Sequence, residues 1–180
     1  QFVPDGASFC LGGFIGRDSV AAVHEIIRQR KKDLTFIDDS KTDTVDLLVG
    51  AGCLKRWEGA YMGYGAIGLP YNVRRAIEQG IPHKLEVEDW SNAAVSMRFL
   101  AGGLNIPYMP TRSLLGSDIP KYNSRIKLTE DPYEGQPVAL VPAARPDAAI
   151  VHVHRADALG NAQVWGFTGN DENKVRAARH

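Results

Sequence analysis

The sequence lacks an excess of charge of either sign. Lys and Arg together number 21, Asp and Glu also number 21, and the formal net charge is zero. A protein that binds nucleic acid needs a basic patch to neutralise phosphates, and no such stripe is present in this sequence. Cysteine is also scarce: Cys10 and Cys53 form neither a disulfide framework nor a zinc motif. We therefore expect no nucleic-acid partner and a reducing compartment, the cytoplasm.

Long hydrophobic runs, internal repeats and low-complexity tracts are missing too. No apolar run reaches the roughly 18 residues that a membrane helix needs, so no membrane association is expected. The 180 residues suffice for one domain with a sizeable core. The sequence starts at Gln1, and the helix expected near its end has no capping residue. We expect residues 1–180 to form a single domain that is truncated at both ends.

Glycine is well represented, and its most informative occurrence is the pair Gly12-Gly13. The apolar segment Phe9–Leu11 leads directly into this pair, and a helix signal with Ser19 as a candidate N-cap follows Phe14. Strand, glycine turn and helix is the arrangement by which an open α/β sheet lets a ligand approach bare backbone. The same arrangement also serves chain geometry alone, so it does not fix a function.

Strands and helices alternate along the rest of the sequence with short connections. Repeated βα units predict an α/β fold, an open and mostly parallel sheet with helices on both faces. The segment 111–137 is different, rich in Pro, Gly, Ser and Asp, and predicts a long surface excursion with one strand at 126–128. Further strands are expected at 34–37, 57–62, 85–87, 138–141 and 148–154. Helices are expected around 47–49, at 73–77 with Gly80 as the stop, at 91–104 with Ser91 as the N-cap, and from 171 on with Val175 as an apolar position.

Residues 5–14 resemble the first signature of the class I coenzyme A-transferases, which ends in three apolar residues and Gly-Gly-Phe. Cys10 is a mild departure from the apolar triplet, and Asp18 and Val20 replace a glycine and a proline of the family pattern, which indicates a divergent branch. Residues 86–119 look like the α subunit of glutaconate CoA-transferase and its relatives, and residues 152–161 look like the family's late strand and turn. The positions that agree in the first signature are Asp5, Gly6, Phe9, Leu11, Gly12, Gly13 and Phe14.

The resemblance covers nearly the whole chain in order. It implies an α subunit of a heteromeric CoA-transferase, which moves CoA between an acyl-CoA and a carboxylic acid, dicarboxylic acids included. Coenzyme A is then a substrate and no cofactor is bound permanently. In this family the catalytic glutamate belongs to the β subunit or to the second half of a fused chain, and no counterpart of that motif is recognisable here. A β subunit is therefore the expected partner.

Candidate substrate contacts follow from sharp turns and polar side chains after the predicted strands. Backbone N–H groups at the sheet edge can stabilise an oxyanion on a thioester carbonyl, and Tyr64 or Asn72 could hold an acyl carbonyl. Arg112 could pair with a second carboxylate of the acyl group. The alternatives are tight turns for the glycines, a helix cap for Asn72, and an Arg112 that is either solvated or paired with Asp118. The residues predicted to bind substrate are Gly12, Gly13, Phe14, Gly63, Tyr64, Asn72, Arg112 and Ser113.

Two further interpretations stay open. Some relatives are hydrolases of CoA esters that use a glutamate of the α subunit, and Glu88 or Asp89 would then be the catalytic acid or base. Otherwise these acids cap the following helix. A non-catalytic ligand-binding α/β domain is the third interpretation. His152 and His154 share a strand face at a spacing that suits metal, but no third ligand follows, so no metal site is predicted.

Overall fold

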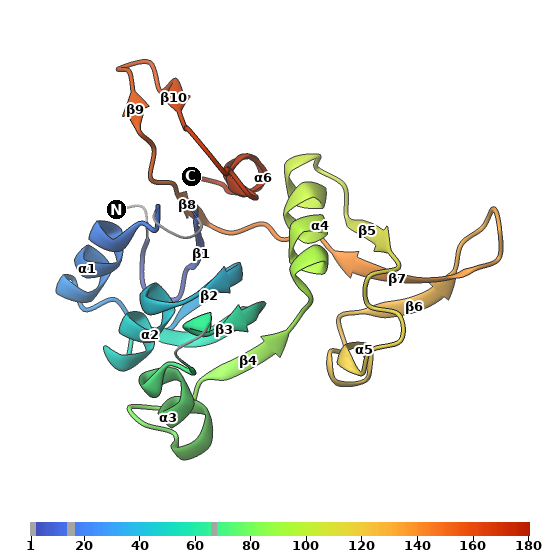
Figure 1. Ribbon diagram of the computed structural model, residues 1–180, viewed down its shortest axis with the longest axis horizontal. Helices are drawn as coiled ribbons and strands as arrows, with labels where there is room; N and C mark the ends of the chain where they lie inside the picture. The colour runs from blue at the N-terminus through green and yellow to red at the C-terminus, as the bar shows by residue number, and fades with distance from the viewer. Residues whose placement is uncertain (1–2, 14–16, 66–67) are drawn as a thin grey trace.

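The computed structural model describes residues 3–13, 17–65 and 68–180 and is built on a five-stranded parallel sheet (Figure 1). All four neighbouring strand pairs are parallel, in the order β4-β3-β2-β1-β8. The predicted open, mostly parallel sheet is thereby confirmed. The strands are β1 (Ser8–Leu11), β2 (Leu34–Lys41), β3 (Leu54–Met62), β4 (Glu86–Asp89) and β8 (Ala148–Ile150).

Helices cover both faces of this sheet, as expected. Side chains alternate along each strand, so Phe9 of β1 packs with the first set of helices while Cys10 packs in the core on the other face. Each face therefore carries its own apolar core. The helices of the first face are α1 (Val20–Arg28), α2 (Asp43–Gly50) and α3 (Tyr71–Gln79), and those of the second are α4 (Asn92–Gly103) and α6 (Asp171–Ala177).

Two helix boundaries follow the predicted local chemistry. The Ser91 hydroxyl accepts a hydrogen bond from the N–H of Ala94 at 3.0 Å and so caps the start of α4. Gly80 ends α3 in the left-handed conformation, with φ of +70°. No helix in the described ranges is both long and apolar enough to cross a membrane.

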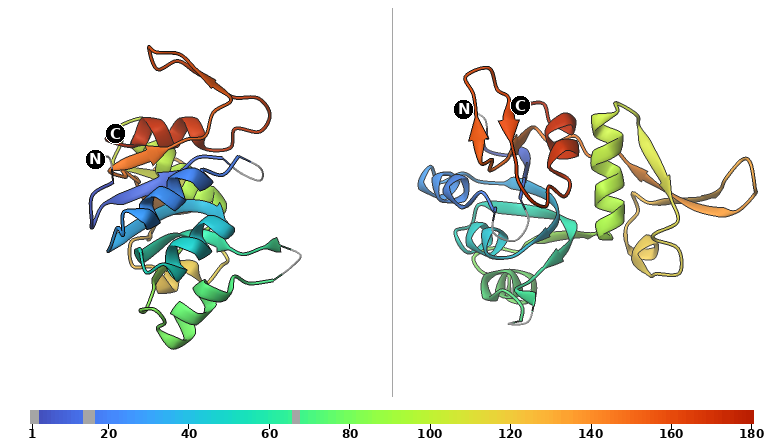
Figure 2. Two further views of the ribbon diagram at one scale, coloured as in Figure 1. Left: turned by 90° about the vertical axis from the view of Figure 1, so that its left-hand side faces the viewer. Right: turned by 45° about the horizontal axis from the view of Figure 1, so that its top comes forward.

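The prediction that 138–141 returns to the main sheet is wrong. This segment lies in β7 (Pro137–Pro142), the central strand of a separate antiparallel sheet with the order β5-β7-β6. Figure 2 (right) shows α4 between the two sheets. The Asp131 carboxylate accepts hydrogen bonds from three backbone N–H groups and closes the hairpin that sets β7 antiparallel to β6. The other elements of this part are β5 (Tyr108–Thr111), β6 (Lys127–Glu130) and α5 (Ile119–Tyr122).

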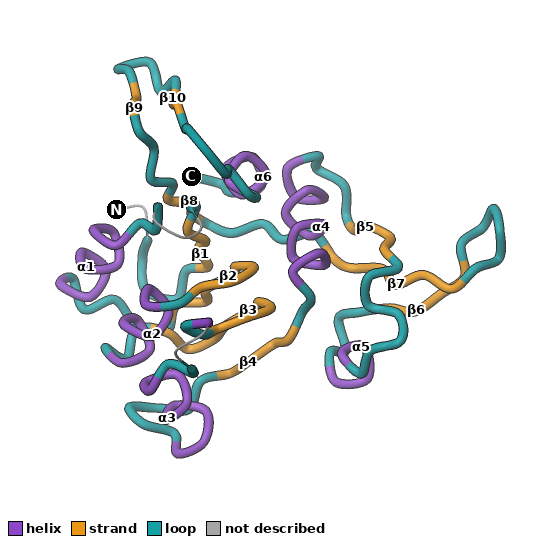
Figure 3. The backbone as a smooth tube through the Cα atoms, in the orientation of Figure 1, coloured by secondary structure: helices purple, strands orange, loops and turns teal. Residues whose placement is uncertain are grey.

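A hairpin of β9 (Arg155–Ala156) and β10 (Ala162–Gln163) extends away from the body (Figure 3). Its turn is closed by Asp157, whose carboxylate accepts from the N–H groups of Leu159 and Asn161 at 2.9 and 2.8 Å. The expectation that His152 and His154 alternate along a strand is wrong, because β8 ends at Ile150. His154 Nδ1 instead accepts from the backbone N–H of Trp165 at 3.2 Å.

Candidate functional site

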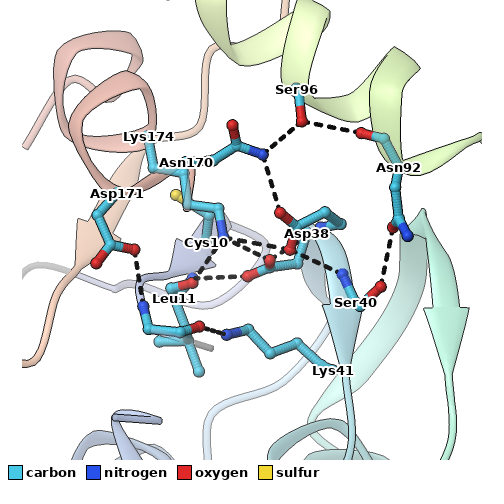
Figure 4. Close-up of polar contacts among 12 residues, drawn as sticks. Cys10, Leu11, Asp38, Ser40, Lys41, Asn92, Ser96, Asn170, Asp171 and Lys174 are labelled. Atoms are coloured by element: carbon cyan, nitrogen blue, oxygen red, sulfur yellow. Dashed lines mark hydrogen bonds and ion pairs between the residues drawn. The ribbon is translucent and has the colours of Figure 1, made fainter. Parts of the chain in front are cut away.

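A polar pocket of about 430 Å³ opens at the carboxyl ends of β1 and β2. In open parallel sheets this edge is where ligands bind. Four elements supply its walls: the turn after β1, the end of β2, the first turns of α4, and the segment that leads into α6 (Figure 4). The lining residues are Gly13, Asp39, Ser40, Asn92, Ser96, residues 167–171 and Lys174.

The pocket exists because β1 and β2 separate at this edge. Their backbone pairing covers Ser8↔Thr35 and Phe9↔Phe36. Farther along, the N–H of Leu11 donates to Asp38 Oδ2 at 3.1 Å, and Lys174 Nζ donates to the carbonyl of Leu11 at 3.1 Å and to Asp38 Oδ1 at 2.6 Å. The buried carboxylate of Asp38 and the buried ammonium of Lys174 thus occupy the place of the backbone hydrogen bonds that would continue the pairing of β1 with β2.

The end of the segment that leads into α6, together with Asp171, the first residue of α6, is tied to the same edge by a second set of polar contacts. Asp171 accepts from Arg17 at 2.8 Å and from the N–H of Gly13 at 2.8 Å. Asn170 Nδ2 donates to Asp39 Oδ2 at 2.9 Å and to Ser96 Oγ at 2.7 Å. One wall of the pocket is therefore held by hydrogen bonds and ion pairs that reach β1, β2 and α4.

The ionised groups of the pocket are paired with each other. Burial alone would raise the pKa of Asp39, but Lys174 and hydrogen bonds from Ser40 and Asn170 outweigh it and hold that pKa at about 2. Complete burial raises the pKa of Asp38 to about 6 against the opposing pull of Lys174. Both acids are therefore engaged by groups of the pocket walls, and neither is a free nucleophile.

One neutral donor, the amide of Asn92, remains on the pocket wall formed by β2 and α4. Asn92 Oδ1 accepts from the Ser40 hydroxyl at 2.9 Å, which fixes the orientation of the amide (Figure 4). Asn92 Nδ2 donates to none of the described residues, so its two N–H bonds are open to a ligand. Such a donor can hold a carbonyl oxygen.

The glycine pair lies at the pocket, but its N–H groups have partners. Gly13 has φ of +86°, and a Cβ there would lie 2.1 Å from the carbonyl oxygen of Arg17. The N–H of Gly12 donates to Ile150 O at 2.8 Å, and that of Gly13 to Asp171. Neither N–H is open to an oxyanion in this structure. Phe14 lies outside the described residues.

The other predicted contacts of the first face do not line the pocket. Gly63 and Tyr64 follow β3, where the N–H of Gly63 donates to Lys41 O at 3.2 Å. Asn72 lies at the start of α3, and its Nδ2 and backbone N–H donate to the carboxylate of Asp46 in α2 at 2.9 and 2.8 Å. This contact joins two helices. The alternative that Asn72 caps α3 is wrong, because the N-cap of that helix is Pro70.

Arg112 and Ser113 lie after β5, also outside the pocket lining. Arg112 pairs with Glu134 at 3.2 Å, and its side chain is 58% exposed. The alternative pairing with Asp118 is wrong, because that carboxylate pairs with Lys121. Ser113 Oγ lies 3.3 Å from the hydroxyl of the helix-capping Ser91.

Glu88 and Asp89 line a separate cavity of about 460 Å³ beside β4. The carboxylate of Glu88 contacts Arg56 and accepts from Arg125 at 3.0 Å and from Trp90 Nε1 at 2.9 Å. A carboxylate held by two guanidinium groups is suited to joining neighbouring segments of the fold. It is poorly suited to acting as a base.

Sequence reasoning missed most of the pocket. It ended the second strand at Ile37, whereas β2 continues through Asp38, Asp39 and Ser40 to Lys41. The available signal was the polar run that directly follows an apolar strand, since strand ends in a parallel sheet meet at one edge. No comparable signal identified Lys174 in the expected terminal helix.

Comparisons with known proteins place this architecture in a family. The chain is 37% identical over 179 residues to the A subunit of 3-oxoadipate CoA-transferase from Pseudomonas knackmussii, covering 99% of this chain and 64% of that protein. The structure matches glutaconate CoA-transferase of Acidaminococcus fermentans with a TM-score of 0.89 and 28% identity, over 99% of this chain and 61% of that one. The structure of the decarboxylase AibA/AibB matches with a TM-score of 0.88 and 32% identity, and the match covers 98% of this chain and 67% of that one.

The chain thus spans less than two thirds of the length of the transferase subunits that it matches. The family model described as coenzyme A transferase matches residues 1–180. The resemblance seen in the sequence is confirmed at the level of the family, and this chain belongs to the coenzyme A transferase family.

Proposed function

We propose that this chain is the acyl-binding part of the α subunit of a CoA-transferase, which moves CoA between an acyl-CoA and a carboxylic acid. One observation carries the proposal. Among the described residues of the pocket, both carboxylates, Asp39 and Asp171, are committed to cations and backbone donors. The pocket therefore offers a place for an acyl group but no free acid to attack it. A partner β subunit supplies that acid.

The proposed chemistry divides between the two subunits. The partner's glutamate attacks the thioester carbonyl, which expels CoA thiolate and gives a mixed anhydride. The thiolate then attacks the glutamyl carbonyl of the anhydride, which forms a glutamyl-CoA thioester and releases the donor acid as its carboxylate. The acceptor carboxylate then takes the CoA by the reverse steps. This chain holds the acyl group, with Asn92 Nδ2 as the neutral donor at the carbonyl oxygen. CoA acts as substrate, with no permanently bound cofactor.

The acyl group itself is not specified by the pocket. Arg112, proposed from the sequence as the partner of a second carboxylate, lies outside the lining residues. The relatives named above include both a decarboxylase and a transferase subunit, so the architecture accommodates more than one reaction. A cytoplasmic location remains a prediction from the low cysteine content.

The test separates the chain from its partner. The two subunits are purified and assayed, singly and then as the reconstituted pair, for CoA transfer from acyl-CoA donors to acetate and to a dicarboxylic acid. The proposal expects no transfer by this chain alone and transfer by the pair. Turnover by this chain as a homogeneous single species would contradict it. Acceptor-independent hydrolysis by the pair, abolished by Glu88→Gln, would favour the hydrolase interpretation.

A further inference from the structure

We propose that Asp38 and Lys174 are positioning residues for the pocket: they keep β1 and β2 apart at the carboxyl edge and fix α6 across the gap. Neither residue was singled out by the family resemblance. The effect on substrate rests on the proposed function, whereas the effect on the pocket walls does not.

The contacts show how the pair separates the strands. Asp38 is fully buried and divides its carboxylate between β1, through the N–H of Leu11, and α6, through Lys174. Lys174 is 2% exposed and donates to the Leu11 carbonyl as well. Both backbone groups of Leu11 are thus satisfied by side chains of other elements. Strand β1 needs no backbone partner from β2 at this point, and the edge stays open.

Only one apolar side chain of α6, that of Ala177, is buried, and it packs in the core beside α4. The helix has seven residues, and its buried positions are Asp171, Lys174 and Ala177, of which two are charged. The apolar Val175 is 53% exposed. Ion pairs and hydrogen bonds therefore determine where the start of α6 lies, and with it the wall formed by 167–171.

The consequence for function is geometric. Gly13 after β1, Ser40 in β2 and Asn170 before α6 are pocket-lining residues on the three elements that this pair connects. A shift of about 1 Å in a wall that positions substrate can lower the catalytic efficiency of an enzyme by a large factor even when the fold itself stays intact. Because walls of this kind contact bound substrate and transition state alike, loosening them raises KM more than it lowers kcat.

The experiment uses the full natural subunit in complex with its partner, with the variants Asp38→Asn, Lys174→Met and the double variant. Activity is measured with acetyl-CoA and succinyl-CoA as donors, alongside thermal unfolding and amide hydrogen exchange. For each single variant we expect at least a tenfold rise in KM, kcat within threefold, and at least tenfold faster exchange in 9–13 and 167–174.

The double variant distinguishes positioning from simple stability. Removing both charges relieves the uncompensated buried ion that each single variant leaves, so the unfolding temperature recovers most of its loss. KM and exchange remain raised, because Met at 174 cannot donate to the Leu11 carbonyl. Recovery of KM and exchange together with the unfolding temperature would overturn the proposal. So would single variants that leave KM and exchange at wild-type values.

Asp147→Asn is the matched control, since Asp147 accepts from the N–H and hydroxyl of Ser8 at 2.9 and 2.7 Å at the opposite end of β1. It should lower the unfolding temperature without changing KM or exchange in 167–174. If the wild-type complex transfers no CoA from either donor, the proposed function loses its support. The exchange data alone then decide the positioning role: faster exchange supports it and unchanged exchange refutes it.

Discussion

Gly13→Ala tests whether the turn after β1 is built for close contact rather than for flexibility. A side chain at Gly13 would place Cβ 2.1 Å from Arg17 O, well inside van der Waals contact. The backbone must then move, and two contacts are at risk: the N–H bond to Asp171 and the 2.6 Å bond from Lys41 Nζ to Gly13 O.

The magnitude follows from the matched variant Gly6→Ala. Gly6 has φ of +76° and nothing within 4 Å of its ideal Cβ, so alanine there costs only the left-handed conformation, about 1 kcal/mol. Gly13 has a similar φ, and a hydrogen bond to a charged group contributes about 1.5–3 kcal/mol. We expect Gly13→Ala to lower the free energy of unfolding by about 4 kcal/mol.

The assay is urea unfolding of the full natural subunit, followed by circular dichroism, for the wild type and both variants. Stability of a whole domain is about 5–15 kcal/mol, so a loss of this size is readily measured. If the two alanine variants differ by less than about 0.5 kcal/mol, the close contact and the two bonds at Gly13 contribute nothing. The turn after β1 would then not depend on close contact at Gly13.

Three further variants test other parts of the account. Asp39→Asn should cost about 2 kcal/mol at pH 7, because the pKa of Asp39 lies near 2 in the folded protein against 3.8 ordinarily. An acid whose pKa is lowered in the folded protein stabilises the fold above pH 4, and this stabilisation is lost as the pH falls toward 2. If urea unfolding shows the same loss of stability for Asp39→Asn at pH 3 as at pH 7, the lowered pKa of Asp39 is contradicted. Glu58→Gln should lower the free energy of unfolding by about 3 kcal/mol in the same assay. The reason is that the buried guanidinium of Arg98, 2.7 Å from Glu58, loses its nearest counter-charge. A loss below about 0.5 kcal/mol would argue against Glu58 as the stabilising partner of Arg98. Arg112→Ala should change stability by less than about 0.5 kcal/mol and, if the sequence prediction holds, raise KM about tenfold for dicarboxylic acyl-CoA donors only. Equal KM values would remove Arg112 from the substrate contacts.

The parts of the fold that could be predicted from the sequence depend on local chemistry. The cap at Ser91 could be predicted because the start of a helix favours a side-chain hydroxyl that accepts a backbone hydrogen bond. The stop at Gly80 could be predicted because the end of a helix often needs a residue with positive φ. The direction of β7 was not readable. An apolar run indicates burial, and this one is buried beside α4 whether its neighbours are parallel or antiparallel.

The candidate site was harder because its buried residues are charged. The sequence predicts Val175 as an apolar position of the last helix, yet Val175 is exposed and Lys174 is buried. Helix prediction from periodicity assumes that the apolar side of a helix faces the sheet. In α6 the ion pair between Lys174 and Asp38 decides which side faces the sheet instead. Asp38 lies 136 residues before Lys174 and 27 residues after Leu11, its other partner. Contacts between such distant residues leave no local trace in the sequence.

Covalent trapping measures most directly which subunit carries the attacking acid. The complex is incubated with acyl-CoA without acceptor, reduced with borohydride and digested, and the reduced carboxyl is located by mass spectrometry. We predict that a glutamate of the partner subunit is converted to its alcohol and that no acid of this chain is changed. A reduced carboxyl at Asp39, Asp171 or any other acid of this chain, in a complex that turns over, would contradict it.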